Sequence, residues 1–493
     1  MNDIVTIRPG DMVAVALRPL QAGQTVAAGG ARLTLAEDIP MGHKLALRAI
    51  RQGEPVVKYG YPIGEATRDI PAGGHVHTDN LRTLLRGEQS YAWRPTHPHL
   101  APQPPVSFPG YRREDGRAGI RNELWIIPTV GCVNDTAEAL ARAAQGLMGD
   151  HVDGVHAFRH PYGCSQLGDD QEATRQILAD LCQHPNAGGV LLLGLGCENS
   201  GVDTILSHMD GDEHPRLRTL ICQQAEDEIE AGLELLQQLA AQMARMARVP
   251  CDTRDLVVGL KCGGSDGLSG ITANPVIGGF SDRLIARGGS TILTEVPEMF
   301  GAETILMDRC EDEATYEKTV RLINDFKRYF EASGQPVYEN PSPGNKAGGI
   351  TTLEDKALGC TQKSGAAPVS DVLPYGGRVK ARGLSLLSAP GNDLVASTAL
   401  AAAGAQIVLF STGRGTPFGC PAPTVKIASN AELARRKAHW IDFDAGALLE
   451  GSTLDELSDA LFEQVLAVAG GAKTRSEAGG YRDLAIFKNG VTL

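Results

Sequence analysis

LVVGLKCGG, residues 256–264, is a short and mostly apolar run that ends in a cysteine and two glycines. Similar runs recur on both sides of it: LWIIPTV (124–130), GGVLLLGLG (188–196), STILTEV (290–296), LSLLSAP (384–390) and QIVLFSTG (406–413). Residues 223–248 and 311–333, which lie between these runs, have helical periodicity and good helix formers. Strands without a polar face that alternate with helices predict an α/β fold built on a mostly parallel sheet with both faces covered.

The N-terminal part of the chain has a different pattern. Residues 1–83 contain short β-rich runs separated by turn signals, which predict a small all-β domain. Six prolines between residues 94 and 110 predict an extended linker over residues 84–110. The α/β part then divides into a middle region, 111–250, and a C-terminal region, 251–493. Residues 331–380 are rich in Gly, Pro and Ser, so we expect loops there, around a site or a subunit contact.

The composition limits the classes of function. The 493 residues include 46 Lys and Arg against 59 Asp and Glu, and the net charge of −13 gives no bulk attraction to nucleic acids or anionic membranes. Charged residues make up 21% and hydrophobic residues 42%, as in an ordinary globular protein. No run of about 18 apolar residues predicts a membrane span, and no secretory signal opens the sequence. We therefore expect a cytoplasmic protein whose ten cysteines are reduced.

Reactive residues follow several of the predicted strands directly: Cys197 and Glu198, Cys262 and Asp266, Glu295 and Glu298, Asn392, and Arg414. Because the carboxyl ends of parallel strands share one edge of a sheet, these side chains are expected to converge on a ligand. Lys346 and Arg414 are cations in glycine-rich loops, which suits a substrate that bears a carboxylate. A surface cation on a turn is an equal alternative for each of them.

The cysteines and histidines offer metal ligands, with a plainer alternative in each case. Cys132, Cys164, Cys197, Cys262 and Cys360 lie next to glycine in loop-like sequence, where each is either a small buried side chain or a ligand. The sequence has no CxxC pair, which disfavours a zinc ribbon or a thioredoxin-type site. His160, four residues before Cys164, suits a metal or an acid–base pair, or lies in a simple glycine turn. His75 and His77 share one face if extended, so they bind a metal, move protons or end a solvated hairpin; His43 has the same ambiguity.

Longer motifs resemble those of the altronate/galactarate dehydratase family, which also includes sulfolactate sulfo-lyase. These motifs are YRREDGRAGIRNELWIIPTVGCVN (111–134), HPYGCSQLGDD (160–170), GLGCENSGVD (194–203), CGGSDGLSGITANP (262–275), TEVPEMFGAE (294–303), ENPSPGNKAGGITTLEDKALGCTQK (339–363), SAPGND (388–393) and LFSTGRGTPFG (409–419). GHKLAL (42–47), VKYGYPIGEA (57–66) and GGHVHTDN (73–80) resemble the β-clip, or SAF, domain that these enzymes carry. The resemblance covers nearly the whole chain in order.

The resemblance implies the dehydration of D-altronate to 2-dehydro-3-deoxy-D-gluconate and water in hexuronate catabolism. It also implies a Rossmann-like C-terminal domain, a middle region that helps to form a homodimer, and ferrous iron with Mn²⁺ as an alternative ion. This reaction needs a base for the C2 proton, positive charge for the resulting anion and an acid for the departing C3 hydroxyl.

The residues above supply candidates for each role. Candidate acids and bases are His75, His77, His160, Glu295 and Glu298; candidate substrate-binding residues are Lys346, Arg414, Asn392 and Asp266; candidate metal ligands are Cys132, Cys164, Cys197, Glu198, Cys262 and Cys360. The iron is either a mononuclear Fe²⁺ or part of an iron–sulfur cluster, and both alternatives stay open.

Three other functions compete with this one. A sister dehydratase would act on galactarate or another sugar acid, and only a substrate panel would distinguish it. An iron–sulfur redox protein would show a reversible visible chromophore and no lyase activity, and the missing CxxC motifs disfavour it. A non-catalytic protein that binds sugar acids would not need clustered thiols and paired histidines.

Overall fold

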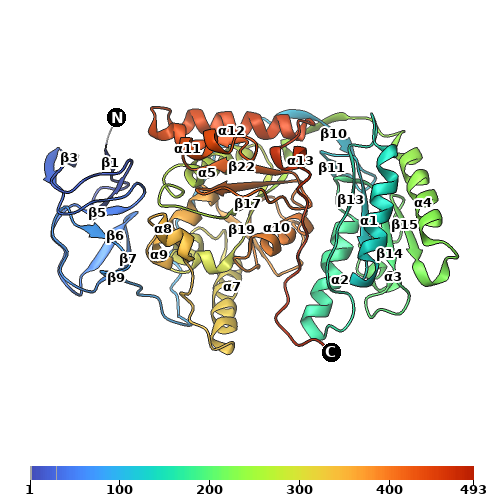
Figure 1. Cartoon of the computed structure of the whole chain (residues 1–493), viewed down its shortest axis with the longest axis horizontal. Coiled ribbons are helices and arrows are strands. Elements are labelled where there is room, and N and C mark those ends of the chain that lie inside the picture. The colour runs from blue at the N-terminus through green and yellow to red at the C-terminus, as the bar shows by residue number, and fades with distance from the viewer. Residues whose placement is uncertain (1–2, 29) are drawn as a thin grey trace.

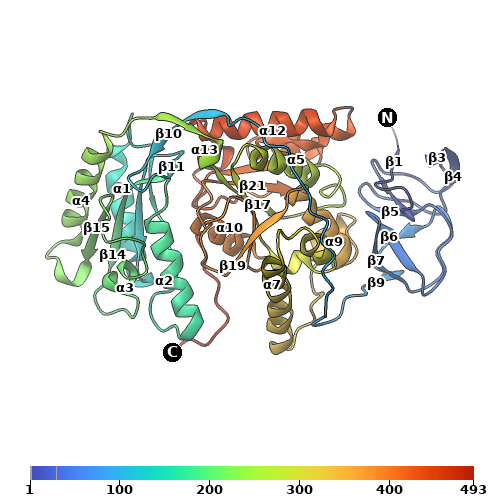
Figure 2. The same cartoon turned by 180° about the vertical axis from the view of Figure 1, so that it is seen from behind.

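The structure is a computed structural model that describes residues 3–28 and 30–493. Three bodies lie in a row, with the N-terminal module at one end, the C-terminal domain in the middle and the second domain at the other end (Figure 1). The order in space differs from the order in sequence because the linker runs along the C-terminal domain, as Figure 2 shows from behind. Backbone hydrogen bonds from Thr96 to Asp308 (2.8 Å) and from Gln103 to Ala286 (2.7 Å) hold it there.

The N-terminal module is built from short antiparallel strands. They are β1 (Ile4–Val5), β2 (Val13–Ala16), β3 (Thr25–Ala28), β4 (Ala31–Thr34), β5 (Lys44–Ala46), β6 (Pro55–Lys58), β7 (Tyr61–Ala66), β8 (His75–Val76) and β9 (Leu81–Arg82). They form sheets in the orders β1-β2-β5-β8, β6-β7-β9 and β3-β4. The predicted all-β module is therefore confirmed.

The second domain has a four-stranded parallel sheet in the order β13-β12-β14-β15. Its strands are β12 (Glu123–Pro128), β13 (Gly154–Ala157), β14 (Ala187–Gly194) and β15 (Leu217–Ile221), and its helices are α1 (Asn134–Ala143), α2 (Gly168–Cys182), α3 (Val202–Leu206) and α4 (Glu228–Met243). A small antiparallel sheet of β11 (Ala118–Gly119), β10 (Ser107–Arg112) and β16 (Val249–Asp252) joins it to the C-terminal domain.

The C-terminal domain has a seven-stranded parallel sheet in the order β19-β20-β18-β17-β21-β22-β23. The strands are β17 (Val257–Cys262), β18 (Ser290–Leu293), β19 (Val369–Leu373), β20 (Gly383–Leu387), β21 (Ile407–Thr412), β22 (Thr424–Ala428) and β23 (Phe443–Asp444). The helices are α5 (Ala273–Ala286), α6 (Glu303–Met307), α7 (Glu313–Ala332), α8 (Pro343–Ala347), α9 (Leu353–Cys360), α10 (Asp393–Ala402), α11 (Ala431–Arg436), α12 (Leu454–Ala469) and α13 (Arg475–Ala478). None of the described helices combines the length and apolar character that crossing a membrane requires.

The predicted fold class is confirmed, and two local expectations are corrected. Residues 107–110, expected to be linker, begin β10 because their backbone pairs with residues 249–252 of β16. Residues 331–380, expected to be loops, contain α8, α9 and β19. Ser342 and Thr352 cap these two helices with side-chain oxygens, and Pro343 is preset for the first helical position, so short helices form in spite of the glycines.

Candidate active site

The candidate active site lies at the carboxyl edge of the seven-stranded sheet. β17 ends at Cys262, and β18 is followed by Glu295 and by the short 3-10 helix η5 (Val296–Met299), which carries Glu298. β17 and β18 are neighbouring parallel strands, so their ends lie side by side. Glu295 has a left-handed backbone with φ 69°, a conformation that is costly for a residue with a Cβ and is concentrated at functional sites.

Helix α9 brings a second thiol to this edge. The Sγ of Cys360 lies 3.5 Å from the Sγ of Cys262. Both thiols approach the same oxygen of Glu298, Oε2, at 3.1 Å from Cys262 and 3.2 Å from Cys360. All three side chains are buried.

Three buried lysines surround these groups. Lys356, on α9, lies 2.7 Å from Glu298 Oε1, and Lys363, just after α9, donates to the Sγ of Cys262 at 2.8 Å. Lys261, on β17, donates to Glu295. Each ammonium therefore meets at least one anion or thiol, which is the condition under which buried charges are tolerated.

The two glutamates have opposite electrostatic surroundings. Burial and the nearby charge of Glu298 raise the pKa of Glu295 against the opposing effect of Lys261 and Lys363. Burial would raise the pKa of Glu298 as well, but Lys356 and Lys363 outweigh it and hold that pKa well below its usual range. Glu298 is therefore ionised near neutral pH, whereas Glu295 takes up a proton more readily. Two carboxyls whose pKa values are pushed apart in this way are typical of acid–base sites.

A cavity of about 600 Å³ opens onto this network. Its walls come from the end of β17, from the segment that includes α8, from α9 and from the loop before α10. Its charged and amide side chains are Glu298, Glu339, Asn340, Asn345, Lys346, Lys356, Asn392 and Asp393. The two lysines and three asparagines among them offer ammonium and amide donors to a small, polar, anionic ligand.

Three histidines of the N-terminal module form a second cluster. The ligand nitrogens of His43, His75 and His77 all lie within 4.8 Å of one another, and His43 Nδ1 lies 3.0 Å from His75 Nε2. Burial lowers the pKa of His43 and of His77 to about 4, so both rings are neutral near pH 7. Neutral imidazole nitrogens are the donors that ferrous iron accepts, and two of them bound to one ion at about 2.1 Å lie about 3 Å apart. The cluster therefore fits a mononuclear metal ion.

Cys262, Glu298 and Cys360 are the other group of three whose ligand atoms lie within 4.8 Å of one another among the described residues. Their surroundings suit a metal less well. Lys363 and Lys356 already lie 2.8 Å from Cys262 Sγ and 2.7 Å from Glu298, and these ammonium groups would repel a bound cation. This network fits proton transfer and anion binding better than metal binding.

The histidine cluster and the cavity both border α8, because the N-terminal module docks on the C-terminal domain of the same chain. His43 Nε2 lies 3.3 Å from the carbonyl oxygen of Ala347, the last residue of α8, whereas Asn345 and Lys346 of that helix line the cavity. A helix of five residues is about 7.5 Å long. The histidine cluster and the cavity are therefore neighbours.

Buried ion pairs hold the module in this place. Lys44 and Lys58 of the module each lie 2.8 Å from a different oxygen of Asp355, and the side chains are 0%, 3% and 1% exposed in that order. Thr83 donates to Glu354 at 2.9 Å. The sequence does not indicate whether the module docks on its own chain or on a second copy. In the structure it docks on the C-terminal domain of its own chain.

Two candidate substrate-binding residues line the cavity and two do not. Lys346 and Asn392 line it. Arg414 donates to the carbonyl oxygen of Gly344 at 3.1 Å, so it supports α8 from outside the cavity wall. Asp266 accepts hydrogen bonds from the hydroxyls of Ser269 (2.8 Å) and Ser429 (2.9 Å) and lies outside the cavity lining.

Five predicted site residues lie in the second domain instead, at the carboxyl edge of its own sheet. His160 is buried, with Nε2 at 2.7 Å from the Pro128 carbonyl. Glu198 accepts hydrogen bonds from Thr129 (2.6 Å) and from backbone N–H groups. Cys132, Cys164 and Cys197 are exposed at this edge. The structure does not bring these five residues to the cavity.

The three buried lysines of the network, Lys261, Lys356 and Lys363, are not among the residues predicted from the sequence. Lys261 interrupts an apolar strand, and a charge inside a buried strand is itself a signal for a partner. Lys356, Cys360 and Lys363 are spaced four and then three residues apart, which places them on one face of a helix. His43, whose sequence context is ambiguous, completes the histidine cluster in the structure.

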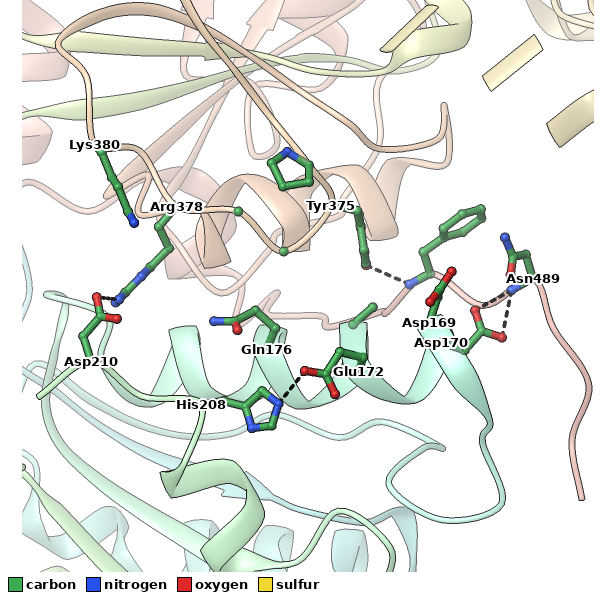
Figure 3. Close-up of a pocket in the computed structure, with 15 residues that line it drawn as sticks. Asp169, Asp170, Glu172, Gln176, His208, Asp210, Tyr375, Arg378, Lys380 and Asn489 are labelled. Carbon is green, nitrogen blue, oxygen red and sulfur yellow. Dashed lines mark hydrogen bonds and ion pairs between the residues drawn. The ribbon is translucent and has the colours of Figure 1, made fainter. Parts of the chain in front are cut away.

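A second large pocket lies between the second and C-terminal domains. Figure 3 shows it between α2 and the 374–380 loop, with a volume of about 700 Å³. Two pairs form among its polar side chains: His208 with Glu172 at 2.7 Å, and Arg378 with Asp210. Within the described part of the chain its lining includes none of the site residues predicted from sequence, so the pocket with the reactive groups is the smaller one.

Comparisons with known proteins agree with the motifs. The family model "D-galactarate/Altronate dehydratase, C-terminal" matches residues 253–492, "D-galactarate dehydratase/Altronate hydrolase, second domain" matches 110–244, and "Altronate/galactarate dehydratase SAF domain" matches 2–84. The altronate dehydratase of Escherichia coli K12 is 54% identical over 492 residues, which cover 99% of both chains. That of Bacillus subtilis 168 is 52% identical over 499 aligned positions, which cover 100% of both chains. The L-threo-forming galactarate dehydratase of E. coli K12 is 33% identical over 477 positions, or 92% of this chain and 91% of the relative.

Proposed function

Since the chain belongs to the altronate/galactarate dehydratase family, we propose that it dehydrates D-altronate to 2-dehydro-3-deoxy-D-gluconate and water. Its altronate dehydratase relatives are hydro-lyases, and the chain is an enzyme of that class. The observation that carries the choice of site is the cavity in which an ionised, buried glutamate lies beside lysines and next to a cluster of neutral histidines. The identities of 52–54% to two altronate dehydratases, against 33% to the galactarate enzyme, support altronate over galactarate.

The cations of the cavity bind the carboxylate of the substrate. Lys346, Lys356 and Asn392 line the same space and offer ammonium and amide donors. When the C2 proton leaves, negative charge grows on the carboxylate oxygens, so donors already in place there stabilise the transition state more than the ground state. In a site screened from water, such donors contribute several kcal/mol.

Glu298 is the base that takes the C2 proton. It is ionised, it lines the cavity and Lys356 fixes its orientation through a contact of 2.7 Å. Glu295 lies behind it, with a raised pKa, and is joined to it through Lys363 and Cys262. The buried network can therefore hold the abstracted proton and return it to the departing C3 hydroxyl, which leaves as water.

The histidine cluster is the site for the metal. His43, His75 and His77 would hold a ferrous ion, or Mn²⁺ in its place, and the ion would supply a Lewis acid at the side of the cavity that α8 borders. Because buried lysines already contact Cys262 and Glu298, we assign the Cys262–Cys360 pair to proton transfer and not to metal binding.

An anaerobic assay tests the proposal. The purified protein is incubated with D-altronate or galactarate, with Fe²⁺ or with a chelator, and the 2-keto-3-deoxy acid product is quantified. We expect product from D-altronate that needs Fe²⁺ and disappears with the chelator. Faster turnover of galactarate would overturn the substrate, and full activity of Glu298→Gln would overturn the base.

A further inference from the structure

Three of the ten cysteines are exposed, and all three lie at one edge of one sheet. Cys132, Cys164 and Cys197 follow β12, β13 and β14, which are adjacent in the order β13-β12-β14. Six of the other cysteines are buried and one is half-buried. Free cysteine is among the most buried residue types. Three exposed thiols that gather at adjacent strand ends therefore need an explanation other than packing.

The loops that carry the thiols pack against one another. The backbone N–H of Gly131, beside Cys132, donates to the carbonyl of Tyr162 at 2.9 Å. The N–H of Ser200 donates to the carbonyl of Gly163, beside Cys164, at 3.1 Å. A Cβ on Gly163 would lie 1.9 Å from the carbonyl oxygen of Thr129, so only glycine permits this approach. The three cysteines are thus held around one small area.

Polar side chains approach two of the three thiols. Cys132 lies two residues before α1, and Cys164 lies four residues before α2. The amide of Gln223 lies 3.7 Å from the Sγ of Cys197, and the thiol of Cys164 lies 3.3 Å from Asn199 Oδ1. Both oxygens of Glu198 already accept hydrogen bonds from the loops, so the exposed thiols are better candidate metal ligands than this carboxylate.

The spacing of the three thiols disfavours a centre with a single metal ion. Three thiolates bound to one Zn²⁺ at about 2.3 Å lie about 3.8 Å apart. The groups of three ligand atoms within 4.8 Å of one another, among the described residues, do not include these thiols. At least two of the thiols are therefore too far apart to share one ion, whereas an inorganic cluster of several irons can bridge a wider separation.

We propose that Cys132, Cys164 and Cys197 bind an iron–sulfur cluster of the [4Fe–4S] type, with the fourth iron free of protein ligands. Each thiol loses its proton when it binds iron, so assembly releases three protons from the protein. The [4Fe–4S]²⁺ state contains two Fe²⁺ and two Fe³⁺, and assembly from both ions with sulfide needs no further oxidant. The cluster would lie in the second domain, on the far side of the C-terminal domain from α8 and α9 (Figure 1). It is therefore a centre separate from the histidine site of the proposed reaction.

The full chain, purified and reconstituted anaerobically with equal amounts of Fe²⁺ and Fe³⁺ and with sulfide, tests the proposal. We expect a broad visible absorption that dithionite bleaches, together with iron and acid-labile sulfide in equal amounts, up to about four of each per chain. Sulfide and absorption report only on the cluster, because the histidine site would hold iron without sulfide. The result is thus independent of turnover with D-altronate. Zinc, iron without sulfide, or no bound metal would overturn the proposal.

Single serine variants assign the ligands. Cys132→Ser, Cys164→Ser and Cys197→Ser should each lose most of the sulfide and absorption while the far-ultraviolet circular dichroism stays unchanged. Cys222→Ser is the matched control, because Cys222 follows β15 at the same edge but is half-buried and packs against the hydrophobic cluster of this domain. Equal losses in all four variants, or in none, would overturn the assignment.

Alkylation gives a second measurement that does not depend on variants. With the cluster bound, Cys132, Cys164 and Cys197 should be protected from iodoacetamide, and removal of the cluster should expose three rapidly labelled thiols. Rapid labelling of these three cysteines in the reconstituted protein would contradict the proposal.

Discussion

Replacing Asp355 by asparagine should detach the N-terminal module from the C-terminal domain. Each carboxylate oxygen of Asp355 lies 2.8 Å from one module lysine, Oδ2 from Lys44 and Oδ1 from Lys58. The lysine side chains are 0% and 3% exposed, so neither ammonium can recover hydration while the module stays docked. A neutral amide would leave two buried cations without their counter-ion.

The size of the effect follows from this geometry. Removing one partner of a buried ion pair costs about 3–5 kcal/mol. Lys44 keeps hydrogen bonds to Gly349 (2.7 Å) and Thr351 (2.6 Å), whereas Asp355 is the one carboxylate partner that Lys58 has among the described residues. We therefore expect a loss of about 3–5 kcal/mol in docking free energy, which is roughly a 10²- to 10⁴-fold change in the docking equilibrium.

Amide hydrogen exchange measures this equilibrium locally. Peptides that cover residues 42–47 and 343–355 should exchange about 10²- to 10⁴-fold faster in Asp355→Asn, whereas those of the second domain should not change. Burial would raise the pKa of Asp355, but Lys44 and Lys58 hold it well below the usual range. The ion pairs therefore stabilise docking above the unfolded pKa of about 3.9 and lose this effect as the pH falls below it. The asparagine variant should lack that acid dependence.

A control and a rescue make the test strict. Glu54→Gln removes an exposed pair with Arg48 inside the module and should leave exchange unchanged. The triple variant with Asp355→Leu, Lys44→Met and Lys58→Met replaces the ions by apolar groups and should restore docking. Less than a tenfold change in Asp355→Asn, or a triple variant that is no better docked, would refute the reasoning.

Three further predictions concern the reaction. His77→Ala should abolish tight Fe²⁺ binding by the histidine cluster and lower kcat at least about 100-fold; metal analysis and the coupled assay check both, with the linker variant His99→Ala as control. Glu298→Gln should lower kcat by about 10²–10⁴ with little change in KM, because it removes the base and not a binding group; a change in KM alone would contradict that role. Lys346→Ala should mainly raise KM, since Lys346 lines the cavity but lies outside the buried network around Glu298, and an unchanged KM would remove it from the substrate site.

Part of this site was predictable from local sequence. Cys262, Glu295 and Glu298 follow two apolar runs that are too short for helices, and parallel strands place such ends at one edge. The histidine pair was predictable because His75 and His77 are two residues apart in an extended segment. In both cases the period of the backbone alone brings the side chains together.

Other features depend on long-range packing that no local pattern reveals. Cys132, Cys164 and Cys197 follow strands just as Cys262 does, yet they belong to a second sheet, because which strands pair is decided by tertiary contacts. The partnership of Lys44 and Lys58 with Asp355 joins residues about 300 positions apart in sequence. A lone lysine in a short strand gives no indication of its partner, so the docking surface could not be predicted from the sequence.

The division of the site between two modules makes docking part of catalysis. The N-terminal module supplies all three histidines, whereas the C-terminal domain supplies Glu298, the lysines and most of the cavity. The backbones of the two modules are in close contact at their interface. A Cβ added to Gly267 would lie 1.9 Å from the carbonyl oxygen of Gly42, and a Cβ added to Gly349 would lie 2.2 Å from the same oxygen. A module that undocks keeps its metal ligands but moves them away from the base. Asp355→Asn should therefore retain Fe²⁺ in the module, lose turnover and speed exchange at the docking surface. Loss of the metal would not retain the Fe²⁺, and loss of the base would not speed the exchange.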